Sequence, residues 1–279
     1  MRETIYNLTS TKYSGDRPLT LSVLADLHNH PDAEIARSLE QNRPDYIVVP
    51  GDLIYGDTRD EERIRSALEE TICPFLRRCR RIAPVILSLG NHEWVLSREH
   101  LGRIASEGVT VLDNRWILAE DGIAFGGMTS GIVMDIRRAL QENGQGFADE
   151  RDRYPLQYRG QIHLPEDEWL EEFESQQAFR ILLCHHPEYW ALQQPYLEAH
   201  PIDLMIAGHA HGGQIGYRRH GERRGLFAPG QGFFPKYTGG MHQGANGSMI
   251  ISRGLTNTVR LIPRIGNPTE IVYITITGK

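Results

Sequence analysis

The sequence predicts an α/β protein with two β-sheets and flanking helices. Three observations support this fold class. Short runs rich in Val, Ile and Leu alternate with stretches of helical periodicity, as expected for strands that are buried on both faces of an α/β sheet. From residue 109 onward, shorter β-like pieces follow one another closely, and the glycine-rich last third contains further β-like runs. The last two features indicate a second sheet rather than a single doubly wound one.

Five apolar runs give the clearest strands, at residues 19–25, 46–50, 84–89, 180–184 and 204–207. Further β-like runs occur at 109–113, 116–120, 123–127, 248–252 and 271–277. Helical patterning covers 33–42, 60–81, 97–107, 132–143, 165–175 and 187–199. Ser97 is a suitable N-cap for the third of these helices. The predicted helices connect the strands, as an α/β fold requires.

The length of 279 residues favours one large domain, residues 1–279, over two small ones. The segment 131–161 is polar, charged and punctuated by glycine, and it separates the two groups of buried strands. We interpret it as either a cap or substrate loop or a plain surface helix and loop.

The formal net charge of −6 argues against a protein whose main partner is the nucleic-acid backbone. One dense basic cluster consists of Arg218, Arg219, His220, Arg223 and Arg224. Because glycines and one glutamate lie among these residues, we interpret the cluster as a solvated hairpin tip rather than a phosphate or membrane contact.

The cysteines indicate a reducing compartment, and the N-terminus argues against secretion. Cys73, Cys79 and Cys184 are an odd number in a chain of this size, so we expect small buried residues and no disulfide. The N-terminal residues are polar, and no window approaches 18 uninterrupted apolar residues. We therefore expect a cytoplasmic protein that is neither secreted nor membrane-spanning.

Each of the five clearest strands is followed by residues that are good metal ligands. In chain order these are Asp26 and His28, then Asp52, then Asn91 with His92 and Glu93, then His185 with His186, and finally His209 with His211. Because ligands bind outside the carboxyl ends of the strands in open α/β sheets, we expect the five ends to converge on one site. Carboxylate, amide and imidazole groups without thiolates suit Mn, Fe, Zn or Ni. The number of groups is too large for one ion and fits two ions that share a bridge.

Each motif has a plainer structural interpretation when it is taken alone. Asp26 could cap a helix, Asp52 could open a turn, and Asn91 could occupy a left-handed turn position. The pair His209 and His211 is harder to explain in this way, because the surrounding glycines allow the backbone to bend until both imidazoles face one pocket. Taken together, the motifs favour a metal site.

The ordered set of Asp-x-His, Gly-Asp, Gly-Asn-His-Glu, His and Gly-His-x-His resembles the calcineurin-like metallophosphoesterase family. This resemblance covers residues 19–211 and implies a four-layer αββα fold, in which two packed β-sheets are flanked by helices. The segments 212–214, 235–240 and 251–255 are similar to the bacterial branch of the family that includes lipid-linked phosphohydrolases.

Carried over position by position, the resemblance implies two metal-binding groups joined by a bridge. One ion would be held by Asp26, His28 and His211, the other by Asn91, His185 and His209, and Asp52 would bridge them. His92 would lie beside the substrate phosphate, where it stabilises charge or protonates the leaving group.

The resemblance also implies the reaction, which is hydrolysis of phosphomonoesters or phosphodiesters by a metal-bridging hydroxide. Two cations about 3.5–4 Å apart lower the pKa of a bridging water, polarise the phosphoryl oxygens and align in-line attack. We expect two divalent ions, with Mn first and Fe, Zn, Ni or Co as alternatives. The expected substrate is a small phosphate ester or a lipid headgroup; contact with a membrane surface is compatible with the sequence, and no nucleic acid is expected.

Two positions depart from the family pattern. His30 stands where the family often has glycine, and the resulting Asp-x-His-x-His opening resembles the PHP-type phosphoesterases, which are barrels. The later motifs in their order do not belong to the PHP pattern. In addition, His185 is followed by His186 where one histidine is expected, and the spacing to Pro187 favours His185 as the ligand, with His186 behind it or exposed.

Two other functions stay open on the sequence alone. The fold can lose its ligands and persist as an interaction scaffold, although the ligand set here is complete. A DNA nuclease of the same superfamily is disfavoured by the acidic balance. Candidates for substrate contact, with loop or strand surface positions as the alternative, are Lys236, Tyr237, His242 and Arg253. Phe233 and Phe234 could be core residues or an apolar lip for a lipid substrate.

Overall fold

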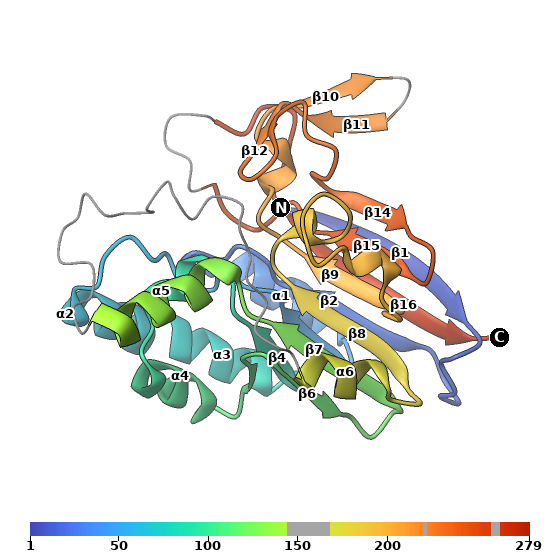
Figure 1. Cartoon of the computed structure of the whole chain (residues 1–279), viewed down its shortest axis with the longest axis horizontal. Coiled ribbons are helices and arrows are strands. Elements are labelled where there is room, and N and C mark those ends of the chain that lie inside the picture. Colours follow the sequence, from blue (N-terminus) through green and yellow to red (C-terminus); the bar gives the residue numbers. More distant parts are fainter. Residues whose placement is uncertain (144–167, 220–221, 258–262) are drawn as a thin grey trace.

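The computed structural model describes residues 1–143, 168–219, 222–257 and 263–279. This part of the chain contains two six-stranded sheets (Figure 1). In spatial order, the first sheet consists of β1 (Arg2–Ser10), β16 (Glu270–Gly278), β2 (Leu19–Val23), β3 (Tyr46–Val49), β4 (Val85–Ser88) and β5 (Thr110–Leu112). The second consists of β14 (Gly240–Gln243), β15 (Ser248–Ile251), β9 (Leu204–Ala207), β8 (Phe179–Cys184), β7 (Ile123–Met128) and β6 (Arg115–Leu118). The predicted second sheet is therefore confirmed.

The two sheets pack against each other through a shared apolar layer. This layer contains Leu21 and Val48 from the first sheet and Leu183 and Ile206 from the second, all fully buried. A second apolar cluster lies between the first sheet and helices α1 (Ala33–Asn42) and α3 (Cys73–Arg80), and a third lies between the second sheet and α6 (Glu168–Glu174). Figure 1 shows α3 beside β4 and α6 beside β6. The order of layers is helix, sheet, sheet, helix, so the expected αββα arrangement is confirmed.

Local sequence signals account for most helix boundaries. Asp32 caps α1 through a hydrogen bond from the backbone N–H of Glu34. The predicted helix 60–81 consists of α2 (Glu61–Ser66), a π-helical turn (Ala67–Ile72) and α3. Ser97 caps α4 (Arg98–Ala105) in a capping box with His100, as the sequence predicts. Helix α5 (Gly131–Asn143) matches the predicted helix 132–143.

The predicted helix 187–199 is wrong. The structure has only two short 3₁₀ turns there, Pro187–Tyr189 and Leu197–Ala199. Pro195 has no N–H to donate to a helical hydrogen bond, and the next residue, Tyr196, has a left-handed backbone with a φ of 55°. Trp190 is 1 % exposed, so burial of this side chain holds the segment in place without regular helix.

Strand β1 was not predicted, because its sequence is polar and half of its side chains face solvent. It pairs in parallel with β16 at the edge of the first sheet. The basic cluster lies on an antiparallel hairpin of β10 (Gly216–Arg219) and β11 (Glu222–Gly225), as predicted, while residues 220–221 lie outside the described ranges. A smaller hairpin, β12 (Phe227–Ala228) with β13 (Gly232–Phe233), follows.

The structure can be compared with three other predictions. The possible cap at 131–161 includes α5, but residues 144–161 lie outside the described residues, as does the start of the predicted helix 165–175. Cys73, Cys79 and Cys184 are free and buried, as expected. Among the described residues, no helix is both long enough and apolar enough to cross a membrane.

Candidate metal centre

The predicted metal ligands follow strands of both sheets at the edge where these strands end. Strands β2, β3 and β4 run parallel in the first sheet, and β8 and β9 run parallel in the second. The carboxyl ends of these strands deliver Asp26 and His28, Asp52, Asn91, His185, and His209 with His211. All seven side chains are buried. The site therefore lies where two packed sheets meet, and not at the edge of one open sheet.

Asp52 lies close to histidines from both sheets. Its Oδ2 is 3.6 Å from Nε2 of His28, which follows β2, and 3.1 Å from Nε2 of His185, which follows β8. The backbone N–H of His92 donates to the other carboxylate oxygen at 2.9 Å. A single carboxylate thus faces both halves of the cluster, which is the position that a bridging ligand needs.

Asp26 is the second carboxylate of the cluster and contacts several of its histidines. Its Oδ1 lies 3.6 Å from Nε2 of His211 and 4.0 Å from Nε2 of His28, and it accepts a hydrogen bond of 3.1 Å from the backbone N–H of His209. The potential ligand atoms form two groups, and within each group all atoms lie within 4.8 Å of one another. One group is Asp26, His28 and His211, and the other is Asp52, His185 and His209. The structure brings these six side chains together, and Asn91 follows β4 at the same edge.

The backbone of the cluster is unusual. Asp26, His28, Asp52, His209 and His211 all have a positive φ, between 45° and 66°. Few residues other than glycine adopt this left-handed conformation, and it costs about 1–3 kcal/mol at a position that does not favour it. Five such positions in one place indicate that the fold holds these side chains against local preference. Strain of this kind concentrates at functional sites.

Two glycines allow the strand ends to approach one another closely. A Cβ on Gly208 would lie 2.9 Å from Oδ2 of Asp26, and a Cβ on Gly90 would lie 2.5 Å from the backbone nitrogen of Asp52. Both separations are shorter than real Cβ contacts, so a side chain at either position would displace a carboxylate of the cluster.

Glu93 is fully buried and joins two of the strand ends. Its carboxylate accepts hydrogen bonds from the backbone N–H groups of Asp52, Leu53, Ile54 and Gly90, at distances from 2.6 to 3.2 Å. The sequence contains Glu93 within Gly-Asn-His-Glu but does not reveal this role. Its buried carboxylate fixes the loop that carries Asp52 to the loop that carries Asn91.

The residues present fit metal ions. Both ring nitrogens of His28 and Oδ2 of Asp26 are buried and lack a hydrogen-bond partner within the described parts of the chain. Buried polar atoms are rarely left without a partner, so these atoms are suited to bind a cation or water. The ring of His185 is oriented by Nδ1, which lies 3.1 Å from the carbonyl oxygen of Pro50. Donation to that carbonyl leaves Nε2 of His185 available as a metal ligand, a common arrangement in metal sites.

The electrostatics of the cluster also suit cations. Burial lowers the pKa of His28, His209 and His211, and a neutral imidazole is the form that ligates metal. Burial raises the pKa of Asp52, but His185 and His92 hold it well below its usual range. Burial lowers the pKa of His185, but Asp52 outweighs this effect and raises it to about 9. The carboxylate of Asp52 therefore remains negative where it faces histidines from both sheets, so it can offset the charge of a cation.

His92 lies at the outer side of the cluster. Its side chain is 18 % exposed, and its Nε2 lies 4.0 Å from Oδ2 of Asp52. The ring stacks on Tyr55 with centroids 5.2 Å apart, and Nδ1 contacts the backbone of Gly56 at 3.1 Å. Tyr55, which the sequence did not reveal as a site residue, also contacts the ring of His28 edge-on. Because a ring nitrogen of His92 also groups with ligand atoms of His28 and Asp52, geometry alone permits a ligand role.

Arg264 is a second functional candidate that sequence reasoning missed. Its Nη2 lies 3.1 Å from Nδ1 of His211 and donates to the carbonyl oxygen of Thr256 at 2.6 Å. Burial lowers the pKa of this guanidinium to about 10. No motif surrounds Arg264, and only tertiary structure brings it to the cluster. A partly buried cation there favours anionic ligands near His211.

The neighbour of His185 is also buried, so the expectation that His186 could be exposed is wrong. The residue is 6 % exposed, and its Nε2 lies 2.7 Å from Oγ of Ser130. The ring of His186 packs against that of His209, with centroids 4.3 Å apart. His185 points toward Asp52, whereas His186 occupies the layer behind it.

Three of the four candidate substrate contacts lie together at the ring of Tyr237. Tyr237 is buried, and Arg253 pairs with Glu270 at 3.6 Å. Lys236 lies over the ring of Tyr237, and His242 meets the same ring edge-on. Phe233 and Phe234 are 72 % and 71 % exposed, which excludes a core position for this pair.

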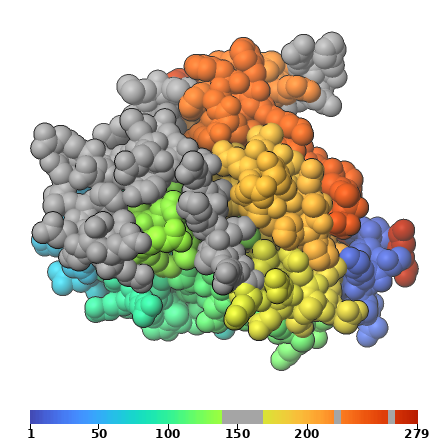
Figure 2. Space-filling model, viewed as in Figure 1, coloured from blue at the N-terminus to red at the C-terminus, as the bar shows by residue number. Residues whose placement is uncertain are grey.

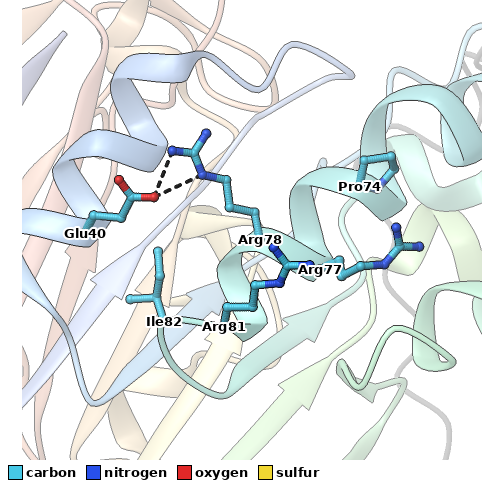
Figure 3. A pocket seen from close by; sticks show the side chains of 6 residues that line it. All are labelled: Glu40, Pro74, Arg77, Arg78, Arg81 and Ile82. Carbon is cyan, nitrogen blue, oxygen red and sulfur yellow. Dashed lines mark hydrogen bonds and ion pairs between the residues drawn. The ribbon is translucent and has the colours of Figure 1, made fainter.

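A separate surface cavity of about 370 Å³ is lined by Glu40, Pro74, Arg77, Arg78, Arg81 and Ile82 (Figure 3). Glu40 is near the end of α1, which precedes β3, and the arginines are at the end of α3, which precedes β4. The cavity thus lies at the amino ends of the strands, opposite the cluster. Arg78 pairs there with Glu40 at 2.8 Å.

The family model for the calcineurin-like phosphoesterase matches residues 19–213, a range that includes all seven residues of the cluster. The chain belongs to this family. A relative from Bacillus subtilis (strain 168), "Uncharacterized protein YpbG", is 26% identical over 275 residues, which cover 96% of this chain and 85% of that protein. "Phosphodiesterase YaeI" of Escherichia coli (strain K12) is 27% identical over 252 residues, which cover 85% and 75% of the two chains.

Among solved structures, a dimetal phosphatase from Danio rerio is similar to this chain with a TM-score of 0.49 and 16% identity. The similarity covers 85% of this chain and 87% of that structure.

Proposed function

We propose that this protein hydrolyses phosphate esters with the help of two divalent cations. The observation that carries the proposal is the convergence of five strand ends from two sheets on one buried cluster. Several polar atoms of this cluster have no hydrogen-bond partner among the residues that the structure describes. The proposed ligands are Asp26, His28, Asp52, Asn91, His185, His209 and His211. Membership of the family supports the same reaction. We infer that residues 1–279 form the single domain that catalyses this reaction.

The cations would supply Lewis acidity, which lowers the pKa of a water and offsets the charge of the phosphoryl group. Mn is the first candidate, and Fe, Zn, Ni or Co also suit a donor set of imidazoles, carboxylates and an amide. The chain contributes the arrangement. Asp52 faces both halves of the cluster, and Glu93 holds its loop through backbone hydrogen bonds.

His92 is the proposed proton donor to the leaving-group oxygen. Its partial exposure allows contact with a substrate, and its contacts with Tyr55 and Gly56 fix the direction of the ring. With Nδ1 held at Gly56, Nε2 is the nitrogen that faces the cluster and can deliver a proton there. Replacement of His92 should therefore slow catalysis and leave the metal content intact.

The proposal is tested with protein stripped of metal and then given Mn, Co, Ni, Zn or Mg. Turnover of p-nitrophenyl phosphate and of bis(p-nitrophenyl) phosphate distinguishes monoesterase from diesterase activity. We expect metal-dependent turnover of at least one ester. If protein shown to contain two ions turns over neither ester, the chain is better explained as a catalytically silent scaffold of the same fold.

Within the phosphate esters, an exposed aromatic and basic surface favours a lipid headgroup as the substrate class. Phe233 and Phe234 are largely exposed and next to the exposed Lys236, a combination that suits an anionic membrane surface. Figure 2 shows the orange segment that contains β12 and β13 at one end of the molecule. This segment is attached close to the cluster, because the amide of Gln231 donates to Glu188 at 2.8 Å.

Vesicle co-sedimentation tests this peripheral membrane contact. Wild type should bind vesicles of phosphatidylcholine with phosphatidylglycerol, and Phe233→Ser combined with Phe234→Ser should abolish most of the binding. Leu118→Ser is the matched control, because Leu118 is 60 % exposed on β6. Equal binding by wild type and the double variant would favour a small water-soluble ester instead.

A further inference from the structure

A third group of metal-ligating atoms lies behind the proposed centre. His186, Glu188 and His209 each offer one ligand atom, these atoms lie within 4.8 Å of one another, and all three residues are buried. Two of the three residues are not among the proposed ligands. The donor set of two imidazoles and one carboxylate is the set found in many three-ligand zinc sites with an open fourth position.

The ring of His186 is held in one orientation. Its Nε2 lies 2.7 Å from Oγ of Ser130, and its face stacks on Tyr189 with centroids 5.1 Å apart. When Nε2 donates to Ser130, the lone pair of Nδ1 faces Glu188. A histidine that ligates metal through one nitrogen and donates a hydrogen bond from the other is the usual arrangement.

Glu188 supplies a carboxylate oxygen that lacks a partner. Its Oε1 accepts a hydrogen bond of 2.8 Å from Nε2 of Gln231, which fixes the side chain. Its Oε2 is buried and has no hydrogen-bond partner anywhere in the described residues. This oxygen lies 3.8 Å from Nδ1 of His186, which is too long for a hydrogen bond. Two acceptors that face each other at this distance can share a cation between them.

We propose that His186, Glu188 and His209 form an accessory divalent-cation site that regulates the binuclear centre. The regulatory part rests on the proposed function, because His209 is also a proposed ligand of the second catalytic ion. A neutral imidazole has a single lone-pair nitrogen, so His209 serves one cation at a time. A cation in the accessory site therefore withdraws His209 from the catalytic centre. Excess zinc should inhibit the enzyme in this way.

Direct zinc binding tests the accessory site without relying on activity. The His185→Ala variant, which lacks a ligand of the second catalytic ion, is compared with the same variant that also carries Glu188→Gln. In equilibrium dialysis against buffered zinc, Glu188→Gln should raise the zinc dissociation constant of one class of sites at least about tenfold, because that site loses its carboxylate ligand. Glu171→Gln in the same background is the control, because Glu171 is exposed on α6. Equal zinc binding with and without Glu188→Gln would overturn the accessory site.

Zinc inhibition provides a second measurement in case the combined variant does not fold. Protein reconstituted with Mn is titrated with zinc during ester hydrolysis, and each variant is compared with its own rate before zinc is added. Glu188→Gln should raise the zinc concentration for half-inhibition at least about tenfold, and Ser130→Ala should raise it less. Unchanged inhibition in Glu188→Gln would overturn the regulatory role. If zinc binding depends on Glu188 but the protein hydrolyses no ester, the accessory site is supported and the proposed function is contradicted.

Discussion

Glu93→Gln is the substitution with the most informative expected effect, because it changes one buried atom and leaves the shape of the side chain intact. Glu93 accepts four backbone hydrogen bonds, two on each oxygen, from Asp52, Leu53, Ile54 and Gly90. A glutamine keeps one acceptor oxygen and places an NH₂ donor against the other two N–H groups. Two buried N–H groups therefore lose their acceptor.

The expected loss of stability follows from these two lost hydrogen bonds. A hydrogen bond to a charged acceptor contributes about 1.5–3 kcal/mol, so the gross loss is about 3–6 kcal/mol. Removing a buried negative charge offsets part of this loss, because burial raises the pKa of Glu93 to about 7, with a smaller contribution from Asp52. We expect a net loss of about 2–4 kcal/mol in the free energy of unfolding. The looser attachment of Asp52 should also weaken metal binding by about 10–100-fold.

Thermal unfolding followed by circular dichroism and Mn binding at buffered free metal measure the two effects. The expected stability loss corresponds to a fall in Tm of roughly 5–15 °C. Glu120→Gln is the control, because Glu120 is exposed in the turn before β7. If Glu93→Gln unfolds within about 1 °C of wild type and binds Mn equally well, Glu93 does not hold the two loops together.

Five further substitutions separate the roles within the cluster. Asp52→Asn should uncouple the ions and lower kcat at least about a hundredfold, measured with metal content in parallel. His92→Ala should keep both ions and lose about 10²–10⁴-fold in rate; loss of an ion would make His92 a ligand. His185→Ala should lose the second ion, and His186→Ala should keep it. The opposite outcome would make His186, and not His185, the ligand of that ion. Gly90→Ala should lower the free energy of unfolding by about 1–3 kcal/mol in denaturant titration, because its Cβ overlaps Asp52.

The strand ends were predictable from the sequence because their signal is local. Buried strands such as β3 and β8 are continuous apolar runs, and the ligand follows directly in the next few residues, as Asp52 and His185 do. Strand β1 gave no such signal, since its side chains are either exposed or only half-buried. The division of the five strands between two sheets also has no local signal, because it depends on which apolar faces pack together.

The residues that support the cluster could not be predicted for the same reason. Glu93 acts through backbone groups up to 41 positions away, and Arg264 reaches His211 from a distance of 53 positions in the chain. Tyr55 contacts His92 only because the loop after β3 folds back on it. A motif identifies side chains that bind a ligand, whereas the contacts that orient those side chains arise from the tertiary fold.

Anomalous diffraction from crystals of Mn-loaded protein tests the central claim most directly. We predict two Mn peaks in the buried cluster, one near Asp26, His28 and His211 and the other near Asn91, His185 and His209, with the carboxylate of Asp52 between them. A single peak, or two peaks that do not share Asp52, would contradict the proposed binuclear centre.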